Sequence, residues 1–332
     1  MDRHMGLEFV RVTEAAALSA ARWKGLGDRH RADEAAVEAM RTRLNDMDID
    51  ATIVIGEGER DEAPMLFIGE RVGRGAFDHA EDYIKIDVAV DPLEGTNLVA
   101  TGSANSISVM AAAVTEEGRL LRAPDTYMMK LAVGEGAKGA INLDDPPATN
   151  VRRIAEALRR HVNDLTVAIL DRDRHRQLIA EVRDAGARIQ LIPDGDISAA
   201  IAAASSQSGV DVLYGIGGAP EGVLTAAALK CMGGDLQCRF QFRNGSERER
   251  AASMGVDDFD RILTIEDLAA GNVTFVATGV TNGDLLRGVR FTERGAETNS
   301  IVMRSKTGTV RELTTHHRFT GAPSQAALGL VS

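Results

Sequence analysis

The sequence predicts an α/β fold, and three observations carry this prediction. The chain of 332 residues exceeds the usual size of one simple domain, which favours two packed lobes or one large α/β unit. Its hydrophobic content of 44% is enough for a large core. Ala-rich helical segments alternate with β-branched runs, most regularly in the second half. We place a linker at Asp144–Thr149 and expect an N-terminal lobe over 1–145 and a C-terminal lobe over 146–332.

The N-terminal lobe is predicted to begin with two helices. Thr13 is expected to cap the first, an Ala-rich run that continues to Trp23 and stops at Gly25. The second covers Asp33–Leu44, with acidic residues in its first turn, where the helix dipole favours them. Asp33 therefore has a structural explanation as well as a chemical one.

Strands follow these helices. Ala51–Ile55 is a β-branched run that ends at Gly56. Tyr83–Val90 is the next strand, and it is expected to end at Asp91, because Pro92 cannot donate to a sheet and forces its predecessor into extended geometry. Two strands therefore deliver acidic residues at their ends. Further strands are predicted over 106–114 and 129–133.

The C-terminal lobe is predicted to alternate helices with strands. The segments are, in order, Val151–His161, Leu165–Leu170, His175–Ala185, Ile189–Ile192, Asp196–Ala204, Val210–Tyr214 and Glu221–Met232. From Asn272 onward the pattern is typical of strands and hairpins, with turns at Asn282–Gly283 and Thr307–Gly308.

The acidic composition excludes several classes of partner. Lys plus Arg total 38 and Asp plus Glu total 49, so the formal net charge is −11, which repels nucleic acid and anionic membranes. No stretch approaches the roughly 18 to 20 apolar residues of a membrane span, and no apolar signal core is found. Cys231 and Cys238 are too few for a disulfide framework, so we expect a cytoplasmic protein. A symmetric homo-oligomer, dimer or tetramer, is expected.

The most informative stretch is the run Asp-Pro-Leu-Glu-Gly-Thr at residues 91–96. Asp91 and Glu94 lie three residues apart across a turn. Gly95 allows a ligand to approach the backbone, and Thr96 adds a hydroxyl and a main-chain N–H at the start of a helix, which suits a phosphate. Two carboxylates beside a phosphate site are what Mg²⁺ or Mn²⁺ prefers, since a hard cation takes oxygen ligands and shares them with substrate phosphate.

Acidic residues in other segments are candidates to complete this metal site. Glu57 follows the first strand, and Asp33 begins the second helix. Acidic residues at strand ends and helix N-termini are also common solvated caps, and for Glu59, Asp61 or Glu62 alone that interpretation is preferred. Four acids in three separate segments, each segment with a glycine or a helix start, favour the metal hypothesis.

Three later loops place polar residues directly after a strand. Arg172–Arg176 offers guanidinium groups that match a phosphate, although such a run is often a solvated face, as we expect for Arg176. Asp194–Asp196 either hydrogen-bonds sugar hydroxyls or caps the next helix. Glu221 follows a glycine loop that lacks the G-x-G-x-x-G spacing, and it is either favoured there by the helix dipole or a metal ligand.

Together these runs resemble class II fructose-1,6-bisphosphatase. The specific ones are Gly-Glu-Gly-Glu-Arg-Asp-Glu-Ala-Pro-Met at 56–65 and Gly-Ala-Pro-Glu-Gly at 218–222, and the similarity extends from Phe9 to His317. The run at 91–96 alone indicates only the wider lithium-sensitive, metal-dependent sugar phosphatase superfamily, which includes inositol monophosphatases. The resemblance implies an α/β/α/β/α layered sandwich, hydrolysis of the 1-phosphate of fructose 1,6-bisphosphate, and two or more Mg²⁺ or Mn²⁺ ions in each active site.

The resemblance also implies roles for individual residues. Asp33 and Glu57 match the ligands of one metal ion, and Asp91, Glu94 and Glu221 match those of another, so most ligands fall in the N-terminal lobe. Thr96 matches the hydroxyl beside the attacking water. The implied substrate contacts are Glu94, Gly95, Thr96, Tyr127, Arg172, Asp173, Arg174, Asp194, Gly195, Asp196 and Gly218. The candidate catalytic residues are Thr96, Glu57, Asp91 and Arg29.

The chain departs from this family in two places. Family members often carry lysine where this chain has Arg29, which can hold a phosphate or a water but does not readily lose a proton. The segment 77–83 is longer and resembles photosynthetic-type members that also accept sedoheptulose 1,7-bisphosphate.

Three alternatives to a simple fructose-1,6-bisphosphatase therefore stay open. The first is dual activity on both bisphosphates. The second is a phosphatase of the same superfamily that acts on inositol phosphates or nucleotide phosphates. The third is a non-catalytic sugar-phosphate or metal sensor, against which Thr96 and the intact acidic residues count, because a pure binder has no use for a positioned water.

Overall fold

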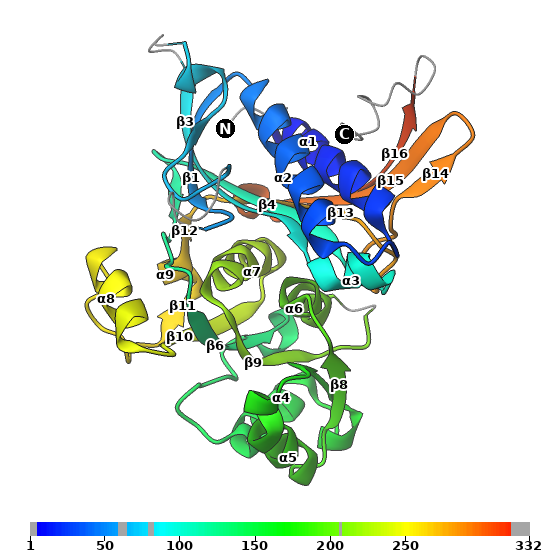
Figure 1. The fold of residues 1–332 in the computed structure, drawn as a ribbon. Helices are drawn as coiled ribbons and strands as arrows, with labels where there is room; N and C mark the ends of the chain where they lie inside the picture. Colours follow the sequence, from blue (N-terminus) through cyan, green and yellow to red (C-terminus); the bar gives the residue numbers. More distant parts are fainter. Residues whose placement is uncertain (1–4, 59–64, 79–82, 206–207, 320–332) are drawn as a thin grey trace. The chain divides into compact units, whose positions relative to one another are not determined.

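A computed structural model describes residues 5–58, 65–78, 83–205 and 208–319 (Figure 1). The chain divides into two compact units. The first unit contains Met1–Val114, Thr274–Met303 and Val310–Ser332. The second contains Thr115–Val273 and Arg304–Thr309, so it includes both sides of the linker predicted at 144–149.

A mixed sheet forms the centre of the first unit. Among the described residues it has eight strands in the order β14-β15-β13-β4-β3-β1-β2, with β16 paired to β15. β1 and β3 are parallel, whereas β3 and β13 both run antiparallel to β4. The strands are β1 (Ile49–Ile55), β2 (Arg71–Val72), β3 (Ile84–Glu94), β4 (Ile107–Val114), β13 (Thr274–Gly279), β14 (Arg290–Thr292), β15 (Gly295–Arg304) and β16 (Thr309–Arg318).

Two long helices lie side by side against one face of this sheet, α1 (Met5–Ala20) and α2 (Arg29–Asn45) (Figure 1). The short helix α3 (Thr96–Thr101) follows β3 and contacts α2. Phe9 of α1 and Met40 of α2 pack with Ile53 and Met110 of the sheet, and all four side chains are fully buried. Each such side chain contributes about 1.5–3 kcal/mol relative to an exposed position. This core fixes the strand ends that carry the acidic residues.

The second unit is a sheet with helices on both faces. Its six strands within the described residues have the order β11-β10-β6-β9-β7-β8. Helices α4 (Pro147–Leu158) and α5 (Arg176–Asp184) cover one face, and α6 (Asp196–Ala204) and α7 (Ala219–Met232) cover the other (Figure 1). The strands are β6 (Tyr127–Val133), β7 (Thr166–Leu170), β8 (Arg188–Ile192), β9 (Val212–Gly218), β10 (Asp235–Gln241) and β11 (Leu263–Thr264).

Small elements complete the second unit. They are the helices α8 (Gly245–Ser253) and α9 (Ile265–Leu268) and the strand pair β5 (Gly118–Leu120) and β12 (Ala269–Gly271). Both units therefore combine helices and sheet in layers, and the predicted α/β fold class is confirmed.

Three predicted helix starts are wrong, and one of them is that of α4, which begins at Pro147 rather than at Val151. Thr13 lies inside α1 rather than at its cap, because the residues before it also present a buried face, and its hydroxyl contacts Val10 O at 3.1 Å and Thr278 Oγ1 at 2.8 Å. The second helix begins at Arg29, and Asp28 is its cap, accepting a hydrogen bond from Arg31 N at 3.1 Å. Asp33 is therefore not a first-turn acid.

The strand β3 also continues past its predicted end at Asp91. It runs through Pro92 to Glu94, with a shift in its register against β4 between Asp91 and Glu94. The pairing with β1 reaches only Ala89, so Pro92 lies where the ladder is irregular and its missing N–H costs little.

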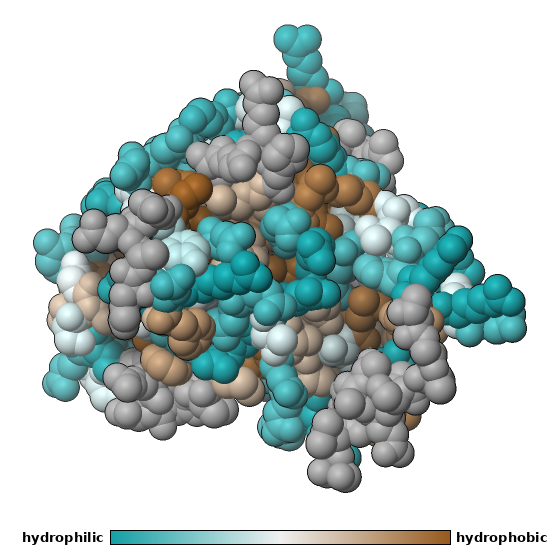
Figure 2. All heavy atoms as spheres, turned by 90° about the horizontal axis from the view of Figure 1, so that it is seen from above, coloured by the Kyte–Doolittle hydropathy of each residue, from teal (hydrophilic) through white to brown (hydrophobic). Residues whose placement is uncertain are grey.

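The surface matches the charged composition. On the face seen in Figure 2, hydrophilic side chains are spread widely among the described residues, and hydrophobic ones lie between them in groups. Within the described part of the chain, no helix has both the length and the apolar content needed to cross a bilayer.

Candidate functional site

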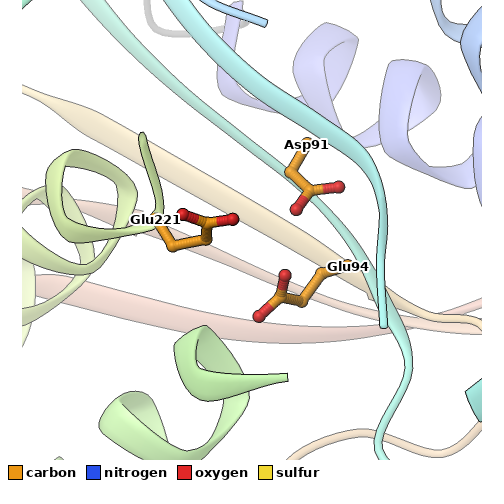
Figure 3. A group of neighbouring side chains, drawn as sticks. All are labelled: Asp91, Glu94 and Glu221. Atoms are coloured by element: carbon orange, nitrogen blue, oxygen red, sulfur yellow. The ribbon is translucent and has the colours of Figure 1, made fainter. Parts of the chain in front are cut away.

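Two acidic residues of the first unit meet at the end of β3. Asp91 and Glu94 each offer a carboxylate oxygen, and these oxygens lie within 4.8 Å of each other (Figure 3). The register shift between them turns both side chains to the same side. Leu93 N donates to Asp91 Oδ1 at 3.0 Å, and Ser106 Oγ donates to the main-chain oxygen of Glu94 at 2.9 Å. Local hydrogen bonds thus hold the backbone that carries both carboxylates.

A left-handed glycine places Thr96 next to this pair. Gly95 has φ of +80°, and a Cβ there would lie 2.7 Å from Leu98 Cδ1, so glycine is the residue that allows the turn. α3 begins at Thr96, whose side chain is partly buried. The hydroxyl predicted to face an attacking water therefore lies two residues from Glu94 on a tightly fixed turn.

Residues of α2 reach the same turn. Arg29 is exposed at the start of α2, and its Nη1 donates to Asn97 Oδ1 at 3.4 Å. Asp33 follows one helical turn later, so it lies on the same face of the helix as Arg29. Burial raises the pKa of Asp33 to about 6, with His30 opposing the shift and Glu34 adding to it. A carboxyl with this pKa is ionised at neutral pH and suits cation binding.

Glu57 is brought to the same edge of the sheet by β1. Ile55 of β1 is aligned with Ala89 of the parallel strand β3, so the residues just beyond each of them leave the sheet at one edge. Glu57 N donates to Leu66 O at 3.1 Å, which fixes its backbone. Among the described residues, Asp33 and Glu57 are outside the group of closely spaced carboxylates, so their role as ligands stays a prediction. Glu59, Asp61 and Glu62 lie outside the described residues.

Glu221 of the second unit is held by the glycine before its helix. Tyr127 of β6 pairs with Gly218 of β9, and α7 begins at the next residue. A Cβ on Gly218 would lie 1.9 Å from Glu221 Oε2, so only glycine leaves room for this carboxylate. Oε2 is buried and accepts no hydrogen bond from any described residue. Burial raises the pKa of Glu221, Lys130 lowers it, and the net direction is upward.

The predicted phosphate-binding loop is tied to β9. Arg174 donates to Ile216 O from Nη2 at 2.9 Å and from Nε at 3.3 Å, and its guanidinium lies 4.8 Å from the centre of the Tyr127 ring. His175 is buried and accepts from Ile216 N at 2.7 Å through Nε2, so its Nδ1 carries the proton and donates to Leu170 O at 2.7 Å. Burial lowers the pKa of His175, in keeping with this neutral form.

The remaining residues of that loop differ in exposure. Arg172 is partly buried and donates to Asp171 O at 3.0 Å. Asp173 and Arg176 form an ion pair of 2.7 Å in which both side chains are at least 80% exposed. The solvated face predicted for Arg176 is therefore confirmed.

Arg243 is a neighbour of Tyr127 that the sequence analysis missed. Its guanidinium lies 4.9 Å from the centre of the Tyr127 ring and pairs with Glu247, a buried carboxylate at the start of α8. Glu247 also accepts from Thr126 Oγ1 at 2.9 Å. Tyr127 is thus contacted by two guanidinium groups. No signal in a single sequence separates Arg243 from the other arginines of 243–250.

Asp196 meets a second residue that was missed, Lys130. Gly195 has φ of +81° and caps α6, so Asp196 is the first residue of that helix. Asp194 Oδ1 accepts from Gly195 N at 3.2 Å. Lys130 in the middle of β6 is fully buried and donates to Asp196 Oδ2 at 2.8 Å. A lone lysine inside the apolar strand 127–133 was the available signal.

Comparisons with known proteins match nearly the whole chain. A family model described as bacterial fructose-1,6-bisphosphatase, glpX-encoded, matches residues 3–317. Three curated relatives carry the name D-fructose 1,6-bisphosphatase class 2/sedoheptulose 1,7-bisphosphatase. The relative from Synechococcus sp. (strain JA-3-3Ab) is 49% identical, and the match covers 97% of each chain. The relatives from Crocosphaera subtropica and Synechocystis sp. are 46% and 45% identical, and each match covers 96% of this chain and 97% of the relative.

The match spans both units and includes the residues at the end of β3, at the start of α7 and around Tyr127. The chain therefore belongs to the glpX-type, class II fructose-1,6-bisphosphatase family.

Proposed function

We propose that this protein removes the 1-phosphate of fructose 1,6-bisphosphate by metal-dependent hydrolysis, giving fructose 6-phosphate and inorganic phosphate. The observation that carries the proposal is the close pair of Asp91 and Glu94 beside the Gly95–Thr96 turn, in a chain that the family model matches over 3–317. Phosphate monoester hydrolysis is very slow without a catalyst, and charge stabilisation by divalent cations is an effective way to accelerate it.

The proposal assigns five carboxylates to divalent cations. As the family resemblance implies, Asp91 and Glu94 (Figure 3) are assigned with Glu221 to one Mg²⁺ or Mn²⁺, and Asp33 and Glu57 are assigned to another. The donor set fits, because these ions prefer carboxylate oxygens and because Glu221 Oε2 is a buried acceptor without a hydrogen bond from the described residues. Bound there, the ions would neutralise phosphate charge and lower the pKa of a coordinated water.

The chain's own groups would position the reactants. The Thr96 hydroxyl would orient a water in line with the ester bond, and main-chain N–H groups at Gly95 and Thr96 would bind phosphate oxygens. Arg29 beside Asn97 would hold phosphate or water without transferring a proton, since a guanidinium stays protonated. The chain itself would form no covalent phosphoenzyme.

The far phosphate of the substrate would bind around Tyr127. Arg174 and Arg243 both contact this ring, and each guanidinium is anchored on one side, by Ile216 O and by Glu247 respectively. Two fixed guanidinium groups match phosphate oxygens. Gly218 and the carboxylates of Asp194 and Asp196 would contact the sugar.

A second candidate activity is hydrolysis of sedoheptulose 1,7-bisphosphate. It is favoured by the three relatives, whose names include this activity, and by the length of the segment 77–83, of which residues 79–82 lie outside the described residues. The longer sugar would keep both phosphates and add one carbon between them.

The decisive experiment is a phosphate-release assay on the purified full-length chain. Fructose 1,6-bisphosphate, sedoheptulose 1,7-bisphosphate and inositol 1-phosphate are compared with Mg²⁺, with Mn²⁺ and with a chelator. We expect release from the first substrate, lost with the chelator and restored by metal. Phosphate release from inositol 1-phosphate alone would favour an inositol phosphatase of the wider superfamily. Binding of a sugar bisphosphate without phosphate release would favour a sensor.

We also propose that the chain works in the cytoplasm as a homo-oligomer, dimer or tetramer. Cys231 and Cys238 are both buried and form no disulfide among the described residues, in keeping with a reducing compartment. Light scattering of the purified protein measures the oligomeric state directly, and a monomeric mass would contradict this part of the proposal.

A further inference from the structure

Lys130 is a fully buried lysine in the sheet of the second unit. Side chains alternate along a strand, so Lys130 points toward α6 and α7, whereas its neighbour Leu131 joins the core beneath α4 and α5. Removing an ammonium from water is costly unless a carboxylate compensates it. A buried lysine in this position therefore needs a specific explanation.

The partner of Lys130 is Asp196, and glycine makes room for the pair. Nζ donates to Asp196 Oδ2 at 2.8 Å. A Cβ on Gly217 would lie 1.9 Å from this Oδ2 and 3.0 Å from Nζ, so any side chain there would displace both groups. Gly222 of α7 approaches from the helix side, where a Cβ would lie 3.9 Å from Lys130 Cε. Two glycines therefore lie next to the ion pair, Gly217 on β9 and Gly222 on α7.

Glu221 is the second carboxylate that faces this ammonium. Burial lowers the pKa of Lys130, but attraction to Asp196 and Glu221 outweighs it, so the net direction is upward. Cys238 is aligned with Lys130 on β10, and burial raises the pKa of its thiol to about 12, so it stays neutral. The Lys130 ammonium therefore attracts both Asp196, a proposed sugar contact, and Glu221, a proposed metal ligand.

Stability alone does not explain this arrangement. Replacing a buried ion pair with apolar residues is often neutral or stabilising, whereas removing only one partner is strongly destabilising. We propose that Lys130 is a positioning residue, whose ammonium, shared with Glu221, fixes the Asp196 carboxylate in the orientation that binds the sugar. This inference rests on the proposed function, because it assumes that Asp196 contacts a sugar phosphate.

The test is a double-mutant cycle made of Lys130→Met, Asp196→Asn and the two together, with the exposed Lys138→Met as the control. KM and kcat for fructose 1,6-bisphosphate are measured with Mn²⁺. The dissociation constant of fructose 6-phosphate is measured by calorimetry on the metal-free proteins, so one measurement does not depend on turnover. Thermal unfolding reports the stability of each variant.

We expect Lys130→Met to weaken fructose 6-phosphate binding at least ten-fold and to raise KM to a similar extent. The double variant should bind as weakly as Asp196→Asn alone, because residues that act as one unit are not additive. A folded Lys130→Met variant with wild-type binding and KM would overturn the proposal. So would a double variant whose loss equals the product of the two single losses.

The cycle stays informative if Lys130→Met does not fold. The double variant removes both charges and is expected to fold, so its comparison with Asp196→Asn still separates a shared role from an independent one. Phosphate release by the unsubstituted chain tests the proposed function separately. If that release is absent but Lys130→Met loses fructose 6-phosphate binding, the assigned reaction is wrong and the positioning role is right.

Discussion

Charges of opposite sign gather at the end of β3 in the first unit and around Tyr127 in the second. At the end of β3 in the first unit, Asp91 and Glu94 bring carboxylate oxygens within 4.8 Å of each other. In the second unit, the guanidinium groups of Arg174 and Arg243 both approach Tyr127. Adjacent carboxylates repel each other, and a bound cation relieves this repulsion, whereas guanidinium groups anchored beside an aromatic ring can hydrogen-bond an anion. The first suits a cation, and the second suits an anion such as phosphate.

The comparison also shows two ways to hold a charged group. In the first unit, a glycine turn and main-chain hydrogen bonds fix the backbone beneath the acids. In the second, the cations are anchored individually, Arg174 on a carbonyl oxygen and Arg243 on the buried Glu247. Substitutions of Asp91 or Glu94 should therefore affect metal-dependent turnover, and substitutions of Arg174 or Arg243 should affect substrate affinity.

The largest expected effect comes from Asp91→Asn. Because this change removes a proposed metal ligand, we expect kcat to fall by roughly 10²- to 10³-fold or more. The unfolding temperature of the metal-free protein should stay the same or rise, since one of two adjacent negative charges is lost. Asp87→Asn, on the same strand, is the matched control. Near wild-type turnover in Asp91→Asn would show that the end of β3 does not bind the catalytic metal ion.

The next effect is expected for Thr96→Val, which removes the hydroxyl and keeps the shape of the side chain. We expect kcat to fall by about 10²-fold with little change in KM, because the hydroxyl would orient the water only in the reaction step. Thr101→Val, at the other end of α3, is the control. A raised KM with unchanged kcat would instead make Thr96 a binding group.

A smaller effect is expected for Arg243→Gln. Loss of one charge-assisted contact to the far phosphate should raise KM roughly ten-fold and leave kcat nearly unchanged. Arg248→Gln is the control, because Arg248 is an exposed arginine of the adjacent helix α8 and stacks on Phe259 at 4.7 Å. Equal KM values for the two variants would indicate that Arg243 does not bind substrate and only stabilises the structure beside Glu247.

The smallest effect concerns Asp33 and pH. Burial raises the pKa of Asp33 to about 6 in the folded, metal-free chain, so its ionised form is disfavoured by folding. Asp33→Asn should therefore raise the unfolding temperature by a few degrees above pH 6. This gain should shrink as the pH falls below about 6 and disappear only below about 3, where the carboxyl is protonated in both states. Thermal scans from pH 4 to 8 measure it, and a gain that grows at low pH would contradict the shift.

Regular segments of the fold could be predicted from the sequence. The helix Asp196–Ala204 has its predicted bounds, and the strand at 107–114 begins within one residue of its prediction, because alanine-rich and β-branched runs have clear local preferences. Helix starts were less accurate. Thr13 has the chemistry of a cap, but the burial of Phe9 and Val10 extends α1 toward the N-terminus, so the helix already begins at Met5.

The candidate site was predictable where local sequence determines geometry. The 91–96 run predicts adjacent carboxylates beside a glycine turn, and the structure has that pair. Lys130 and Arg243 were missed because their importance comes from residues far away in sequence, Asp196 and Tyr127 respectively. Neither contact can be predicted from a single sequence.

The chain order of the first sheet has a consequence for biosynthesis. β4 is paired on one side by β3 and on the other by β13, which begins at Thr274 and is translated about 160 residues later. Until the ribosome has made that strand, one side of β4 presents open main-chain groups that invite misassociation with other nascent chains. The Thr115–Val273 segment, which forms most of the second unit, is translated before β13, so the sheet that carries Asp91 and Glu94 is completed later than that segment.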